Sequence, residues 1–105
     1  MNRTVRHHDV LMKYLARPRE AAAYLSVVAE DGDLKFLLKA LRNVVEAQGG
    51  IGKLAKKTKL SRTTLYKTLS EDGNPEIGTL EIILRAYRIR IGFFPEQTRR
   101  HPRAA

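Results

Sequence analysis

The sequence predicts an all-α fold, a bundle of about five helices followed by one short C-terminal β-strand. Apolar residues recur at helical spacing through most of the chain, and clusters of turn residues separate these stretches. The last apolar stretch alternates instead, which is typical of a strand. With 105 residues, of which 43% are hydrophobic, the chain is expected to fold as one domain with a modest core.

Turn and cap residues divide the chain into its expected helices. Pro18 can open a helix, because its missing N–H would be unpaired in the first turn anyway. Gly32 suits a left-handed helix cap. Asp33, Ser61 and Thr79 each precede a helical stretch and are expected to be N-caps. The expected helices cover residues 9–16 (a short helix or a turn), 18–30, 34–48, 51–58, 62–70 and 79–87.

The two ends of the chain are expected to differ from this helical part. Residues 1–8 are interpreted as a flexible basic arm, residues 9–94 as the folded domain and residues 95–105 as a flexible basic tail. In residues 88–94 apolar residues alternate with arginine or glycine, so one face of the strand would be buried. That face would consist of Ile89, Ile91 and Phe93. A single strand must pair with something, either a second copy of the chain, another partner or an extended N-terminal segment.

Charge is both large and unevenly distributed. The chain has 20 Lys and Arg against 11 Asp and Glu, a formal charge of +9, which indicates an acidic partner such as nucleic acid or an anionic membrane. Residues 47–70 contain no acidic residue, and their six cations would attract a polyphosphate. These cations are Lys53, Lys56, Lys57, Lys59, Arg62 and Lys67. The alternative is a solvated basic face on an ordinary helical bundle.

The same interval has the layout of a helix-turn-helix. A helix over 51–58, a tight turn at 59–61 and a helix over 62–70 would place the second helix in the major groove of DNA. Leu65 and Leu69 would face the core, which leaves the opposite face to DNA. The residues expected to contact bases are Arg62, Thr63, Thr64, Tyr66 and Lys67. Those expected to contact phosphates are Gly52, Lys53, Lys56, Ser61 and Ser70.

Several motifs carry a resemblance to a known family. The stretches ALRNVVEAQGG, LAKKTKLSR and LYKTLSEDGNP, with YLSVVAEDGD before them, resemble the HigA-like family of addiction-module antidotes over about residues 9–92. The resemblance implies a Cro/repressor-like domain, a homodimer on double-stranded operator DNA and a RelE-like toxin as partner. The chain departs from the family pattern at two positions. Lys59 stands where the family usually has glycine, and Thr63 where it often has glutamate.

Other kinds of site find little support in the sequence. There is no cysteine, which excludes disulfides and cysteine-ligated metals. The stretch GGIGK at 49–53 lacks the spacing of a phosphate-binding loop, and His7-His8-Asp9 is interpreted as exposed rather than as a metal site. Because no recognisable motif positions a nucleophile beside a base, we expect neither an enzyme nor a cofactor.

The sequence also predicts a location for the protein and leaves three hypotheses about its function. No apolar run is long enough to cross a membrane and no signal core begins the chain, so we expect a cytoplasmic protein without a membrane partner. An antitoxin that represses its own operon is the leading hypothesis. A stand-alone phage-type repressor would use the same DNA contacts without a toxin. A protein–protein adaptor, whose basic face meets an acidic protein, is a third hypothesis.

Overall fold

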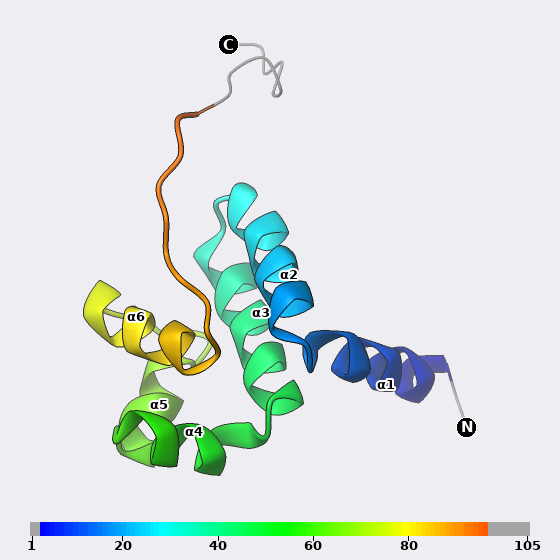
Figure 1. Ribbon diagram of the computed structural model, residues 1–105, viewed down its shortest axis with the longest axis horizontal. Helices are drawn as coiled ribbons and strands as arrows, with labels where there is room; N and C mark the ends of the chain where they lie inside the picture. Colours follow the sequence, from blue (N-terminus) through cyan, green and yellow to red (C-terminus); the bar gives the residue numbers. More distant parts are fainter. Residues whose placement is uncertain (1–2, 97–105) are drawn as a thin grey trace.

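The computed structural model describes residues 3–96, with side chains from His7 onward, and these residues form six helices (Figure 1). The helices are α1 (Arg3–Leu15), α2 (Pro18–Glu30), α3 (Leu34–Ala47), α4 (Gly50–Thr58), α5 (Arg62–Thr68) and α6 (Ile77–Ala86). Helix α3 packs against α1, α2 and α4, while α4 packs against α5 and α6. The predicted all-α bundle is confirmed, and the contact between α3 and α4 joins its two halves.

Local capping explains most of the boundaries that the sequence predicts. Pro18 begins α2, and Gly32 has φ +76° in the turn that follows this helix. The carboxylate of Asp33 accepts a hydrogen bond of 2.9 Å from the Lys35 N–H at the start of α3. The hydroxyl of Ser61 accepts one of 3.0 Å from the Thr64 N–H at the start of α5. These four predictions are confirmed.

Helix α1 is longer than the sequence predicts. It begins at Arg3, so residues 3–8, which the sequence suggests are part of a flexible basic arm, are helical. Once a helix has formed, each further residue adds a hydrogen bond at little cost, and α1 is also joined to the C-terminal end of α3. His8 Nε2 lies 2.9 Å from Glu46 Oε2. The amide nitrogen of Gln48 donates to the carbonyl oxygens of Leu15 (2.9 Å) and Ala16 (3.1 Å).

Helix α6 begins earlier than predicted. Its N-cap is Glu76, whose carbonyl oxygen accepts the first intrahelical hydrogen bond from the Leu80 N–H at 3.0 Å. Thr79 therefore lies inside the helix, and its assignment as the N-cap is wrong. The apolar spacing of this stretch predicts that Ile82, Ile83 and Ala86 are buried, but the Ile82 side chain is 44% exposed. The helix instead buries Ile83 and Tyr87, four residues apart on one face, which turns the neighbouring Ile82 outward.

No strand forms in residues 88–94 of the described chain, contrary to the sequence prediction. Arg88 has φ +64°, and its N–H bonds to the Arg85 carbonyl at 2.9 Å, while the Ile89 N–H bonds to the Leu84 carbonyl at 3.0 Å. This pair of bonds is a Schellman motif, which caps α6 and packs Ile89 against the helix end. Ile89, Ile91 and Phe93 thus belong to no sheet, because the predicted strand meets no second strand among residues 3–96.

The core is continuous through both halves of the bundle. Its buried members are Leu15, Ala21, Leu25, Ala40, Leu41, Val44, Val45, Leu54, Leu65, Leu69, Ile83 and Tyr87. Leu54 and Leu65 are only 1% and 0% exposed, so α4 and α5 are fixed to the bundle by apolar packing. The hydroxyl of Tyr87 is buried without a hydrogen-bond partner, and this burial raises the pKa of Tyr87 to about 12.

Candidate nucleic-acid interface

A three-residue turn joins α4 to α5, and its hydrogen bonds come from the chain nearby. The hydroxyl of Thr58 donates to the Leu54 carbonyl oxygen at 2.9 Å and accepts from the Leu60 N–H at 3.2 Å. Lys59 follows in the left-handed conformation, with φ +67° and its N–H bonded to the Ala55 carbonyl at 2.9 Å. Ser61 then caps α5. The turn is therefore determined by residues 54–61 themselves.

Lys59 takes a conformation that favours glycine. Although it is not glycine, Lys59 adopts the left-handed conformation, with φ +67°. A side chain in this conformation costs about 1 kcal/mol. The substitution also adds a cation to the turn between the two basic helices.

The inner side of α5 is held against both α3 and α4. Leu65 and Leu69 are buried, as the sequence predicts. From α3, the guanidinium Nη1 of Arg42 donates to the Leu69 carbonyl oxygen at 2.6 Å. This bond satisfies a carbonyl at the end of α5 that the helix itself leaves unpaired. Helix α5 has only seven residues, and these tertiary contacts fix its orientation.

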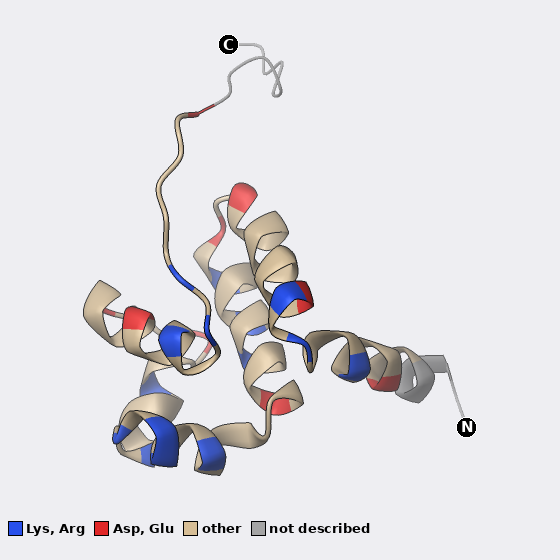
Figure 2. Cartoon of the chain, viewed as in Figure 1, with Lys and Arg blue, Asp and Glu red and all other residues tan. Residues whose placement is uncertain are grey.

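The outer side of α5 is exposed and basic. All five residues expected to contact bases, namely Arg62, Thr63, Thr64, Tyr66 and Lys67, have exposed side chains. Tyr66 is the largest apolar surface among them, at 61% exposure. Figure 2 shows lysine and arginine along α4 and α5 and no acidic residue there. Such a surface attracts polyanions.

Arg62 lies back across α4. Its Nη2 atom is 3.1 Å from the position that a Cβ atom at Gly52 would occupy. The guanidinium therefore rests over Gly52 and links the two helices. From the sequence, Arg62 was expected to contact a base and Gly52 a phosphate. Because Gly52 has no side chain, the two outer surfaces of α4 and α5 form one continuous face at this point.

Three of the hydroxyl groups expected to contact DNA, those of Ser61, Thr64 and Ser70, already form local hydrogen bonds. Ser61 Oγ donates to Thr64 Oγ1 at 3.0 Å, and Ser70 Oγ donates to the Lys67 carbonyl oxygen at 3.0 Å. These bonds cap the two ends of α5. Lys53 and Lys56 make no such local bond among the described residues, and both are exposed on α4. The two lysines are therefore the better placed phosphate candidates.

Sequence reasoning missed the residues that orient this surface. Arg42 and Gln48 bond to carbonyl oxygens 27 and 33 residues away, so no local pattern could reveal their partners. A long polar side chain beside an apolar helical stripe is a general signal of such a role, but it does not name the partner. These contacts fix α1 and α5 on opposite sides of α3.

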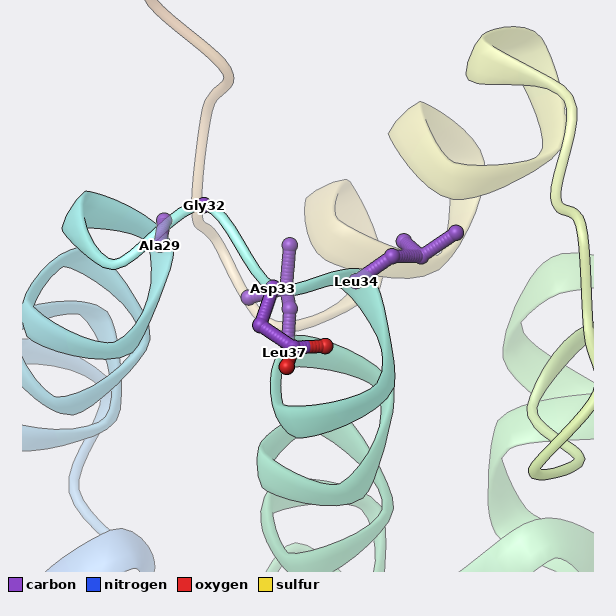
Figure 3. Close-up of a pocket in the computed structure, with 5 residues that line it drawn as sticks. All are labelled: Ala29, Gly32, Asp33, Leu34 and Leu37. Atoms are coloured by element: carbon purple, nitrogen blue, oxygen red, sulfur yellow. The ribbon is translucent and has the colours of Figure 1, made fainter.

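Two hollows lie on the described surface. One, of about 160 Å³, lies below the turn between α2 and α3 (Figure 3). Its only polar side chain is that of Asp33, which already caps α3, and its other lining residues are Ala29, Gly32, Leu34 and Leu37. The other, of about 390 Å³, lies between α3, α4 and α5, with Ile51, Tyr66 and Leu69 in its wall. The polar side chains of Arg42, Glu46 and Ser70 also line this second hollow.

The described residues also bear on metal binding and on membrane insertion. They hold no group of three or more His, Cys, Asp or Glu side chains that could bind a metal ion. None of their helices is long and apolar enough to cross a membrane. The candidate site therefore rests on the basic surface of α4 and α5.

Comparison with known proteins assigns the family. Residues 4–95 match the sequence model of a family described as "probable addiction module antidote protein". The chain belongs to this family of antidotes. An uncharacterized protein of Haemophilus influenzae strain Rd is 27% identical over 90 residues, which cover 86% of this chain and 91% of that protein. No solved structure matches the chain.

Membership gives this antidote a general role. An addiction-module antidote acts against a toxin, so the family implies a toxin partner and a regulatory rather than an enzymatic protein. The match runs from α1 through the segment after α6, and so includes every helix of the described structure. The basic surface and the segment after α6 are therefore both parts of the antidote domain.

Proposed function

We propose that this antidote is a DNA-binding antitoxin that represses its own operon and neutralises a RelE-like toxin. Helices α4 and α5 would form a helix-turn-helix. The observation that carries the proposal is the surface of residues 47–70, which has six cations and no acid and lies on two short helices joined by a tight turn. A solvated basic face explains the charge, but it does not explain why the charge coincides with this layout.

The proposed binding mode follows from the exposure of the two helices. Helix α5 would enter the major groove, with Thr63, Tyr66 and Lys67 directed at the bases. Helix α4 would cross the phosphate backbone, with Lys53 and Lys56 as its main contacts. Arg62, which rests over Gly52, would act where the two helices meet, within reach of either a base or a phosphate.

A homodimer on a two-fold symmetric operator remains part of the proposal. Two half-sites one helical turn apart require two copies of α5 related by symmetry. A second copy of the chain was one of the possible partners of the predicted strand at 88–94, but the described residues form no strand there. The dimer would therefore use another surface of the bundle. The RelE-like identity of the toxin is supported only by the resemblance of the sequence to HigA-like antidotes.

A test of base preference distinguishes sequence-specific recognition from nonspecific electrostatic binding. Promoter DNA of this chain's own operon and variants with single base-pair changes would be titrated with the protein and with Thr63→Ala and Lys53→Ala. We expect Thr63→Ala to alter the ranking of the DNA variants, since mismatches at a read base pair typically cost about 1–3 kcal/mol. Lys53→Ala should weaken binding to all of them alike.

Two outcomes would contradict the proposal. If both substitutions leave binding unchanged, α5 is not the reading helix. If the unmodified protein fails to bind DNA even at low salt, the basic face meets an acidic protein instead. A promoter that is bound, in an operon that encodes no toxin, would favour the stand-alone repressor.

A further inference from the structure

The segment that follows α6 is extended and makes no backbone pairing. From Arg90 to Glu96 none of its backbone groups is hydrogen-bonded to another backbone group within the described residues. Figure 1 shows this segment, in orange, running away from α6 without coiling. Extended backbone with unpaired N–H and C=O groups is the state of a strand that lacks its neighbour.

The side chains of the segment divide into two faces, as in a strand. Ile89 packs on the core, Ile91 is half-buried, and Phe93 continues the same face into solvent at 85% exposure. On the other face, the ring of Phe94 lies 3.3 Å from the position of a Cβ atom at Gly92. Alternate residues thus share a face although no sheet is present.

The exposed aromatic rings indicate that the segment has a partner. Phe93 and Phe94, at 85% and 86%, are the most exposed large apolar side chains of the described chain. Adjacent exposed aromatics are unfavourable in water and typically mark a surface that binds another protein. The family match extends to residue 95, so the rings lie inside the antidote domain.

The kind of partner follows from what the chain itself lacks. The described residues contain no strand, so a second copy offers no sheet edge except the same segment. Two such segments would form an isolated two-stranded ribbon, which is marginally stable in water. They would also bring together two chains of charge +9, each with Arg88 and Arg90 in the segment. A partner with its own sheet supplies a row of hydrogen bonds without forming an isolated two-stranded ribbon.

We propose that residues 89–94 bind the toxin by adding a strand to an open β-sheet edge of that protein. Main-chain hydrogen bonds would supply affinity, and alternate side chains, led by Phe93 on one face and Phe94 on the other, would occupy pockets of the toxin. Pro95, which has no N–H, would end the pairing. The inference rests on the toxin partner that the family implies and needs none of the proposed DNA contacts.

Proline substitution tests the backbone pairing directly. In an added strand, the N–H groups of alternate residues point to the partner and the others to solvent. Arg90→Pro and Ile91→Pro would each be compared with alanine at the same position, which removes the side chain but keeps the N–H. The extended backbone before each site suits a residue that precedes proline. The probe is the purified toxin encoded beside this chain's gene, titrated into the full-length antidote.

We expect one of the two prolines to weaken toxin binding at least tenfold beyond its alanine control, and the other to weaken it far less. DNA binding should be unchanged in both variants, since the segment runs away from α4 and α5 (Figure 1). Each proline variant should have the same thermal midpoint as its alanine control, which already lacks any packing of the native side chain. Phe93→Ser should weaken toxin binding as well, with the same two controls unaffected.

The contrary outcomes are distinguishable. If both prolines match their alanine controls, no strand is added and the inference is wrong. If Ile91→Pro dissociates a dimer of the antidote in sedimentation experiments, the partner is a second copy and the inference is again wrong. If the unmodified antidote does not bind the toxin at all, the pairing with that toxin fails too, while DNA binding by α4 and α5 is judged separately.

Discussion

The α4–α5 unit and the segment after α6 have similarly clear sequence patterns, yet only the first takes the predicted structure. Helices α4 and α5 close their backbone hydrogen bonds within the chain, and Thr58 and Ser61 complete the turn between them. The alternating residues 88–94 need a neighbouring strand, and the described chain provides none. A local pattern therefore predicts a helix reliably, whereas it predicts a strand only if a partner exists.

The largest expected effect on stability compares a buried side chain of α5 with an exposed one of the segment after α6. Leu65→Ala should destabilise the fold by about 3 kcal/mol, because it removes a fully buried side chain between α5 and the core. Phe93→Ala removes a larger side chain, but this one is 85% exposed, so the change should stay within about 0.5 kcal/mol. Urea unfolding of both variants measures the difference. Equal losses would show that the segment packs on the bundle in solution.

A second prediction concerns the turn that ends α5. A Cβ atom at Gly73 would lie 2.5 Å from the Thr68 carbonyl oxygen and 3.0 Å from that of Ser70, so Gly73→Ala should cost on the order of 2 kcal/mol. Gly78→Ala is the matched control, since nothing lies within 4 Å of its Cβ position in α6, and it should stabilise by roughly 0.5–1 kcal/mol. Thermal unfolding reads out both. A neutral Gly73→Ala would contradict the geometry of the turn.

A third prediction concerns the pH dependence of stability, through Tyr87 at the end of α6. Burial raises the pKa of Tyr87 from 10.0 to about 12, so the folded state keeps a proton that the unfolded state releases. The contribution of Tyr87 to the free energy of unfolding is fully present below pH 10 and is lost as the pH rises toward 12. Tyr87→Phe should remove this part of the alkaline loss, whereas Tyr66→Phe, at an exposed position, should not. If the stability of the two variants depended on pH in the same way, the alkaline loss could not be assigned to Tyr87.

The smallest expected effects come from two left-handed residues, one in each region. Lys59 and Arg88 have φ +67° and +64°, and glycine at either position should relieve strain, for a gain of about 0.5–1 kcal/mol. Lys57→Ala is a control that removes a nearby charge without changing this conformation. Chemical denaturation measures all three. A loss of stability in Lys59→Gly would show that its side chain contributes more than its backbone strain costs.

The sequence could predict the helices because their signals are local. Pro18, Gly32, Asp33 and Ser61 mark boundaries that the structure confirms. The start of α1 could not be predicted, because it depends on contacts such as that of His8 with Glu46, 38 residues away. The burial of Ile83 rather than Ile82 likewise depends on which face of α6 meets α4.

The candidate site was predictable in composition but not in detail. Charge and helical spacing indicated which side chains of α5 face outward, and these are exposed. The position of Arg62 over Gly52 and the bond of Ser61 to Thr64 depend on side-chain geometry that spacing does not determine. The predicted tail from residue 97 onward lies outside the described residues.

The central claim, that α4 and α5 bind DNA, is tested most directly by salt dependence. The affinity for promoter DNA would be measured by fluorescence anisotropy over a range of salt for the antidote and for Lys53→Gln/Lys56→Gln. Two lost phosphate contacts should reduce the slope of log affinity against log salt by about 1.8. Lys13→Gln/Arg19→Gln, which removes the same charge from α1 and α2, should leave the slope nearly unchanged. Equal slopes for the two double variants would contradict the claim.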